Sequence, residues 1–118
     1  MEHEARLRAL YAAFNAREID TVLAALADDV DWPIAWEGGW LRGRAAVRDY
    51  WTRQWAEIDG RVDPVGFASL PDGRVAVEVD QTVHDRAGAL LSEGRVRHVY
   101  AFRDGLVVAM DVEEAAAG

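Results

Sequence analysis

The sequence predicts an α+β domain in which three N-terminal helices pack on one face of a curved, mostly antiparallel sheet. Three segments in the first half repeat apolar residues at helical spacing, and the second half alternates apolar and polar residues between turn signals. Helices followed by a run of strands are typical of this architecture. With 118 residues, the chain is predicted to be a single domain over 1–118, with a core at about 5–113 and a frayed tail at 114–118.

Two short amphipathic helices open the chain. Apolar side chains recur at the 0, 3, 4, 7 spacing of one helix face, first as Leu7, Leu10, Tyr11 and Phe14 and then as Ile19, Val22, Leu23 and Leu26. A polar break at 15–18 separates the two helices. We expect Asp28-Asp29 to end the second helix before DVDW enters extended structure.

A third helix is predicted to begin at Gly43 and to end at Asp59-Gly60. Its apolar face consists of Val47, Tyr50, Trp51, Trp55 and Ile58. The preceding segment, PIAWEGGWLRG, is too rich in glycine and tryptophan for a regular element. Pro33 lacks a backbone donor, so a strand there would be short, bulged or at an edge.

Four antiparallel strands are predicted at 62–70, 74–84, 91–103 and 106–112, divided by PDG, DRAG and DG turns. Alternation assigns one set of side chains to the inner face: Val75, Val77, Val79, Gln81, Val83, Val96, His98, Tyr100, Phe102, Leu106, Val108, Met110 and Val112. On the outer face, Glu78 and Asp80 are expected to pair with arginines of adjacent strands.

The turn at 103–105 allows two hairpin registers. A three-residue loop pairs Arg97 with Asp111 on the outer face and places His98 opposite Met110. A two-residue loop would instead place Asp111 beside His98 and push Met110 outward. The opposite-charge pairing favours the first register.

Composition excludes several classes of function. The net charge of −8 argues against a nucleic-acid or anionic membrane partner, and the absence of cysteine excludes disulfides and thiolate chemistry. No run of apolar residues approaches a membrane span, and MEHEARLR lacks the apolar core of a signal peptide, so a cytoplasmic location is expected. The three histidines are not spaced as metal ligands, and we expect neither a metal nor a cofactor.

An aromatic-walled pocket for a small apolar or aromatic molecule is predicted inside the fold, because such walls with few polar groups suit flat ligands. The predicted lining is Tyr11, Phe14, Trp32, Trp36, Tyr50, Trp51, Trp55, Gln81, Phe102 and Met110. The alternative interpretation is that these aromatic side chains simply fill a small core.

His98 is the leading candidate for chemistry, with Tyr100 or Gln81 as a neighbouring donor. The ordinary pKa of histidine lies near neutrality, so a partly buried imidazole can donate or accept a proton and stabilise an enolate. Alternatively, His98 is a core histidine whose hydrogen bonding is satisfied by Gln81 or by a tyrosine hydroxyl. For Asp31, a solvated or helix-capping role is favoured over that of a base.

The helix pair 7–31 and the GRAAVRDYW block resemble the SnoaL-like branch of the nuclear transport factor 2-like superfamily, which includes ketosteroid isomerases and polyketide cyclases. The resemblance implies a cone-shaped sheet with the helices on its concave face, an internal pocket, and a homodimer that pairs through the sheet. In polyketide cyclases of the SnoaL type, an aspartate on the last strand acts with a histidine on the preceding strand. His98 and Asp111 lie on those strands, although Val112 holds the position where the family's aspartate usually lies.

Comparison with the ketosteroid isomerases places Leu10 where that family has its oxyanion tyrosine and Ile34 where it has its general base. Only His98, at the position of the protonated aspartic acid, carries a proton there, so the steroid isomerase mechanism is not expected. Two hypotheses follow. The first is cofactor-free proton transfer of the isomerase, cyclase or dehydratase type, with His98, Tyr100 and Asp111 as candidate catalytic residues. The second is a non-catalytic ligand-binding or dimerisation module.

Overall fold

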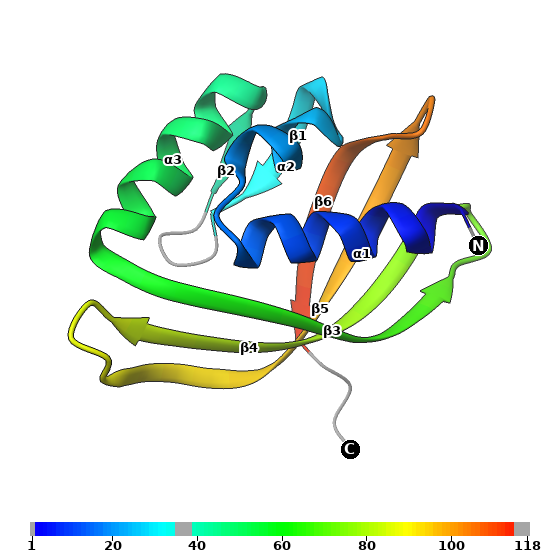
Figure 1. Ribbon diagram of the computed structural model, residues 1–118. Coiled ribbons are helices and arrows are strands. Elements are labelled where there is room, and N and C mark those ends of the chain that lie inside the picture. The colour runs from blue at the N-terminus through cyan, green and yellow to red at the C-terminus, as the bar shows by residue number, and fades with distance from the viewer. Residues whose placement is uncertain (1, 35–38, 115–118) are drawn as a thin grey trace.

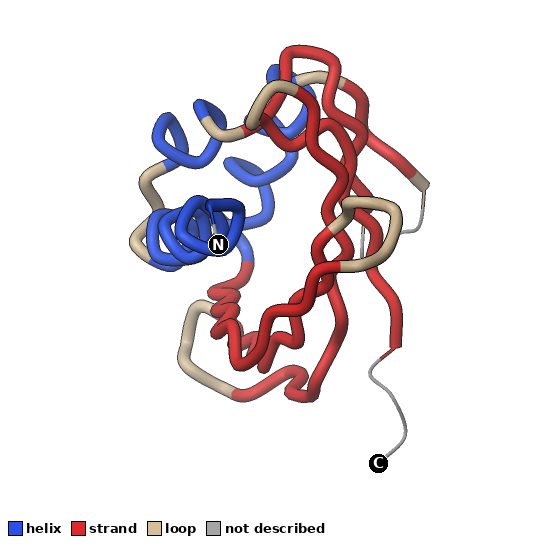
Figure 2. The backbone as a smooth tube through the Cα atoms, turned by 90° about the vertical axis from the view of Figure 1, so that its right-hand side faces the viewer, coloured by secondary structure: helices blue, strands red, loops and turns tan. Residues whose placement is uncertain are grey.

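Three helices lie on one side of a curled six-stranded sheet, as the sequence predicts (Figures 1 and 2). The computed structural model describes residues 2–34 and 39–114. The elements in chain order are α1 (Glu2–Asn15), α2 (Ile19–Ala24), β1 (Leu26–Pro33), β2 (Trp40–Arg42), α3 (Arg44–Glu57), β3 (Ile58–Ser69), β4 (Val75–Asp85), β5 (Leu90–Arg103) and β6 (Leu106–Glu114). In the described part, no helix is long and apolar enough to cross a membrane.

The sheet has the order β2-β1-β6-β5-β4-β3. All neighbouring strands are antiparallel except β1 and β6, which run parallel. This arrangement confirms the predicted mostly antiparallel curved sheet with the helices on its concave face. It leaves β3 at one edge of the sheet. Pro64 is tolerated there because proline has no backbone N–H to donate, and an edge strand has no neighbour on one side that would need one.

The first helix ends in a Schellman motif. Arg17 has a φ of 63°, in the left-handed region, and the N–H groups of Arg17 and Glu18 donate to the carbonyls of Phe14 and Ala13. The Arg17 guanidinium lies over the Trp55 ring, 5.0 Å from its centroid. The predicted polar break at 15–18 is therefore a compact turn after α1, and its Arg17 side chain packs against α3.

Several predicted boundaries differ from the structure. The second helix ends at Ala24 rather than at Asp28-Asp29, because Leu26 already belongs to β1. The third helix ends at Glu57, and Gly60 lies inside β3 instead of breaking the chain. The tryptophan-rich segment does contain a regular element, since Trp40–Arg42 forms β2 against the end of β1.

The inner faces of β4 and β5 match the predicted alternation. Val75, Val77, Val79 and Val83 are buried on β4, and His98 and Tyr100 are buried on β5. They pack against the apolar stripes of α1 and α3, so the core lies between the helices and the sheet. On the outer face, Asp80 accepts a hydrogen bond from Arg95 at 2.8 Å, as expected.

The β5–β6 register differs from the favoured prediction. Arg103 lies opposite Leu106, so the turn has two residues, and a bulge between Ala101 and Phe102 then shifts the ladder by one. Beyond the bulge, His98 lies opposite Val112, and Arg97 lies opposite Glu113 instead of Asp111. The bulge lets a two-residue turn keep Met110 buried on the inner face.

Candidate functional site

A cavity of about 110 Å³ lies between the helices and the inner face of the sheet. Its lining comes from α1, α3 and five strands: Leu10, Tyr11, Phe14, Trp32, Pro33, Tyr50, Trp51, Gln54, Ile58, Gly60, Arg61, Val62, Gln81, Val83, His98, Tyr100, Met110 and Val112. The lining residues of the described chain include no carboxylate.

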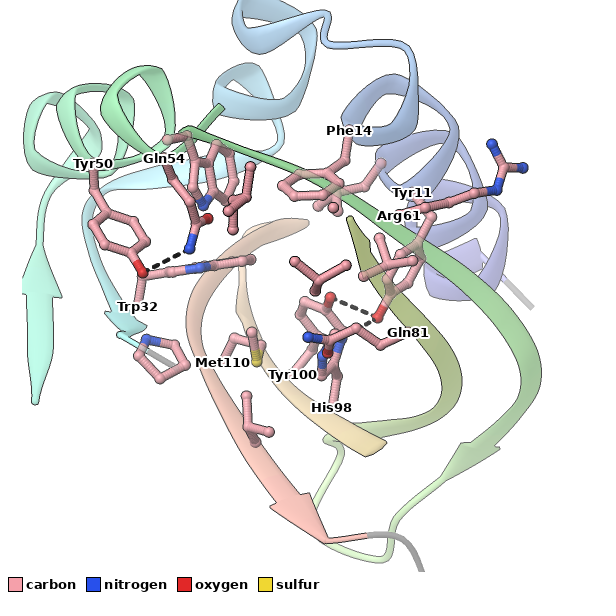
Figure 3. A pocket seen from close by; sticks show the side chains of 18 residues that line it. Tyr11, Phe14, Trp32, Tyr50, Gln54, Arg61, Gln81, His98, Tyr100 and Met110 are labelled. Atoms are coloured by element: carbon pink, nitrogen blue, oxygen red, sulfur yellow. Dashed lines mark hydrogen bonds between the residues drawn. The ribbon is translucent and has the colours of Figure 1, made fainter. Parts of the chain in front are cut away.

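The cavity is closed at its floor and open at its rim. Tyr11, Trp51, His98 and Tyr100 are buried, whereas Gln54, Ile58, Gly60 and Gln81 are only half-buried and Arg61 is exposed. The Arg61 guanidinium pairs with Asp63 and points away from the cavity in Figure 3. A ligand would therefore enter beside β3 and meet an apolar floor with few polar atoms.

One strand and one helix bring the polar floor together. Tyr11 follows Leu7 and Leu10 on the buried face of α1, so its ring reaches the sheet. His98 and Tyr100 are two residues apart on β5, and alternation therefore directs both side chains inward. Figure 3 shows the three side chains converging beside Gln81.

The three side chains form one hydrogen-bond chain. The Tyr100 hydroxyl donates to the Tyr11 hydroxyl at 2.8 Å, and the Tyr11 hydroxyl lies 2.7 Å from His98 Nδ1. The rings of Tyr11 and His98 are almost parallel, with an angle of 11° between them. The imidazole Nε2 has no hydrogen-bond partner within the described chain, so it is available to a ligand.

Burial sets the protonation of this chain. It lowers the pKa of His98 to about 4, because a charged imidazole is poorly solvated there. Burial also raises the pKa of both tyrosine hydroxyls well above the ordinary value, and for Tyr11 the neighbouring Tyr100 adds to the effect. At neutral pH the site therefore contains a neutral imidazole and two protonated phenols.

The opposite wall of the cavity is aromatic. Trp51 meets Trp32 edge to face at a centroid distance of 5.3 Å and Phe14 at 5.2 Å. On this wall, Gln54 Nε2 donates a hydrogen bond to the Tyr50 hydroxyl at 2.9 Å (Figure 3). Such edge-to-face packing holds the rings in fixed positions and favours a flat guest.

Most of the predicted site residues meet at this cavity: Tyr11, Phe14, Trp32, Tyr50, Trp51, Gln81, His98, Tyr100 and Met110. Trp55 instead packs outside it against Phe14 and Trp51. Phe102 stacks on His3, with ring centroids 3.9 Å apart, at another part of the fold. Trp36 lies outside the described residues.

Asp111 does not reach the cavity. It lies opposite Val99 on the outer face and is exposed, which agrees with the outward orientation that the favoured register gave it and not with a site shared with His98. The suggested partner Arg97 is not paired with it either, because the bulge brings Glu113 to Arg97 at 3.6 Å. We therefore no longer consider Asp111 a candidate catalytic residue.

Sequence reasoning missed the rim residues Gln54, Ile58, Gly60 and Arg61. Gln54 could have been found, since it lies one helical turn after Tyr50 on the same face of α3. The other three were missed because the third strand was predicted to begin only at Val62. Within the described residues, no group of three or more histidine or acidic side chains is placed to hold a metal ion.

Comparison with family models matches residues 7–110 to the SnoaL-like domain. The chain belongs to the SnoaL-like domain family. The match spans most of α1, the other two helices and nearly the whole sheet, including every residue of the hydrogen-bond chain from Tyr11 to His98 and Tyr100. A comparison with curated proteins gives no match.

Solved structures with the nuclear transport factor 2-like fold superpose closely on this SnoaL-like domain. One is a nuclear transport factor 2-like protein of unknown function from Burkholderia pseudomallei, with 26% identity over 97% of this chain and 91% of that chain and a TM-score of 0.83. A candidate polyketide cyclase from Xanthomonas campestris pv. campestris is 24% identical over 94% and 88%, with a TM-score of 0.81. TerC, co-crystallised with polyporic acid, is 24% identical over 95% and 90%, with a TM-score of 0.82.

Proposed function

We propose that this SnoaL-like domain binds a small, flat apolar or aromatic molecule that carries an oxygen atom, and that His98 is the polar contact for this oxygen. One observation carries the proposal: His98 is the only buried polar side chain, tyrosines apart, in the described chain, and it lines the cavity. Its Nε2 atom makes no hydrogen bond within the described chain, so an oxygen atom of a ligand in the cavity can pair with it.

The size of the cavity limits the buried part of the ligand. A cavity of about 110 Å³ is comparable to the engineered apolar cavity of about 150 Å³ that binds benzene. One six-membered ring therefore fits inside, and further rings would extend through the rim beside Gly60. The co-crystal of TerC with polyporic acid supports this proposal, because a protein of the same fold was crystallised with a small molecule.

The reaction that suits this site is proton transfer of the isomerase, cyclase or dehydratase type, without a cofactor. A ligand carbonyl hydrogen-bonded to the neutral His98 would be polarised, and the charge that develops on its oxygen would be stabilised as the proton on the neighbouring carbon passes to a water molecule at the open rim. Tyr11, 2.7 Å from Nδ1, supports the imidazole from behind.

A non-catalytic ligand carrier is the second candidate, and one observation favours it. The cavity lining in the described chain contains no carboxylate that could remove a proton, and the raised pKa values of Tyr11 and Tyr100 keep their hydroxyls protonated. A carrier would need only the aromatic walls and the single polar contact.

Thermal unfolding against a panel of ring compounds tests binding. We expect a single-ring aromatic ketone to raise the melting temperature. A ligand at 100 times its dissociation constant adds about 2.7 kcal/mol to the free energy of unfolding. Replacing the exposed Trp40, which does not line the cavity, by alanine is a control that should leave the shift intact. The absence of a shift for every compound would overturn the proposal.

The H98Q variant separates the two candidates once a reactive ligand is known. Loss of turnover with retained binding supports proton transfer at His98, and unchanged turnover excludes it.

The homodimer implied by the family also stays a prediction. Light scattering on the eluting protein tests it, with the outer-face variant R95E expected to weaken a dimer that pairs through the sheet.

A further inference from the structure

The hydrogen-bond chain formed by Tyr100, Tyr11 and His98 contains a limited number of protons and acceptors. Each hydroxyl has a single proton to donate, and a neutral imidazole has one N–H and one acceptor nitrogen. All three side chains are buried, with exposed fractions of 1%, 2% and 7%. Every proton in the chain therefore needs an acceptor inside the protein or in the cavity.

Only one direction of donation uses both hydroxyl protons. If Tyr100 donates to Tyr11, then Tyr11 has its own proton available for Nδ1, as the distances of 2.8 and 2.7 Å allow. If a protonated Nδ1 donated to Tyr11 instead, either the Tyr11 or the Tyr100 proton would have no acceptor in the described chain. A buried donor without an acceptor is costly, because it has lost its bond to water and gained none.

The donation by Tyr11 decides which nitrogen of His98 is protonated. Nδ1 acts as an acceptor, so the single proton of the neutral ring lies on Nε2. Burial favours the neutral ring and protonated phenols, which is the state that this pattern requires.

We propose that Tyr11 is a positioning residue that fixes His98 as the Nε2-protonated tautomer, and that the cavity therefore selects ligands with an acceptor oxygen, such as a ring ketone or a quinone. The selectivity for such ligands rests on the proposed ligand-binding function. His98 then donates to the ligand and does not act as its base. A molecule of the same shape without an acceptor leaves the Nε2–H unpaired and binds more weakly.

The tautomer can be measured on the free protein, so this part of the test needs no ligand. Long-range ¹H–¹⁵N correlation spectra of histidine-labelled protein distinguish a protonated from an unprotonated ring nitrogen, and H98Q assigns the signals. At pH 7 we expect Nε2 of His98 to be protonated and Nδ1 to be unprotonated. A protonated Nδ1 in the unmodified protein would overturn the assignment.

Ligand selectivity tests the second part, with acetophenone and ethylbenzene as probes of similar shape. We expect acetophenone to bind about threefold to tenfold more tightly, the effect of one hydrogen bond. Y11F should lose this preference and populate both tautomers. Y100F, which keeps the Tyr11–His98 bond, should retain the preference even if its overall affinity changes.

The outcomes separate this inference from the proposed function. If neither probe nor any larger ring compound binds, the proposed function fails, and with it the selectivity, while the spectra still decide the tautomer. If both probes bind equally to the unmodified protein, the cavity is a binding site and the selectivity is wrong. If Y11F does not fold, the spectra and the two probes on the unmodified protein still test the proposal.

Discussion

Asn15 and Val62, 47 residues apart, are joined by two hydrogen bonds between a side-chain amide and a backbone. Asn15 Nδ2 donates to the Val62 carbonyl at 2.7 Å, and the Val62 N–H donates to Asn15 Oδ1 at 2.9 Å. Since β3 is an edge strand, the amide takes the place of a neighbouring strand at this point. The contact holds the end of α1 against the strand that supplies the rim of the cavity.

Replacing Asn15 by alanine should lower the free energy of unfolding by about 1–3 kcal/mol, because two half-buried backbone groups lose their partners. Urea denaturation measures the change. N15D keeps the acceptor for the Val62 N–H but faces the carbonyl with a second oxygen, so it should also destabilise the protein. An N15A variant as stable as the unmodified protein would show that water replaces both bonds.

Acidification should destabilise the protein through His98. The pKa of this group is about 4 in the folded state, against an ordinary value of 6.5, so the unfolded chain binds the proton more readily. The contribution of the neutral His98 to the free energy of unfolding is therefore complete above pH 6.5. It is lost as the pH falls towards 4, by about 3 kcal/mol in total. Carboxylates also titrate in this range.

The H98Q variant separates the contribution of His98 to this pH dependence from that of the carboxylates. The difference in unfolding free energy between H98Q and the unmodified protein should shift in favour of H98Q as the pH falls from 7 to 4. Parallel stability curves over this range would contradict the assignment of a buried neutral imidazole.

Adding a side chain at Gly60 should close the cavity without harming the fold. Gly60 lines the cavity on β3 opposite Val83, and a Cβ there would meet no atom within 4 Å. We expect G60V to weaken binding of a ring ketone at least about tenfold, since the added methyl groups occupy ligand space. Titration calorimetry or fluorescence of the lining tryptophans measures it.

A matched control for G60V lies on the same strand. Gly66 pairs with Glu78 on the outer face, where a Cβ would make an ordinary contact of 4.0 Å, so G66V should bind ligand normally. Equal binding by G60V and the unmodified protein would show that ligands do not pass or occupy this part of the rim.

Gly105 should tolerate alanine less well than Gly88 does. Both have a positive φ, of 80° and 94°, so both variants carry backbone strain. At Gly105 the Cβ would also lie 2.0 Å from Arg6 Nη1, which donates to the Gly105 carbonyl at 2.7 Å. G105A should therefore cost about 0.5–1.5 kcal/mol more than G88A. In an R6A background the extra cost should disappear.

The helices and the inner face of the sheet could be predicted because both follow from local periodicity. The stripe ending at Phe14 and the alternation around His98 need only the spacing of apolar residues. The register of β5 and β6 could not be predicted in this way. An opposite-charge pair between Arg97 and Asp111 favoured another register, but the bulge near Ala101 shifts the ladder by one residue and has no local signal in the sequence.

The site was predictable in its composition but not in its connections. Alternation placed His98 and Tyr100 inside, and a tyrosine hydroxyl was one of the partners considered for the imidazole. That Tyr11 is this partner depends on how α1 crosses the sheet, which brings together residues 87 positions apart. The spacing of residues along the chain therefore cannot predict the contact between Tyr11 and His98.

The parallel pairing of β1 with β6 has a consequence for how the protein is made. Leu26 and Asp31 lie beside Val107 and Ala109, so the strand that follows the first two helices pairs with a strand that is made only after α3 and three further strands. A ribosome must release the chain as far as β6 before the sheet can close, and the contact between Tyr11 and His98 likewise forms only after β5 has been released. Folding dominated by such distant pairings is slow, and the apolar faces of the helices stay exposed to aggregation until β6 has been made.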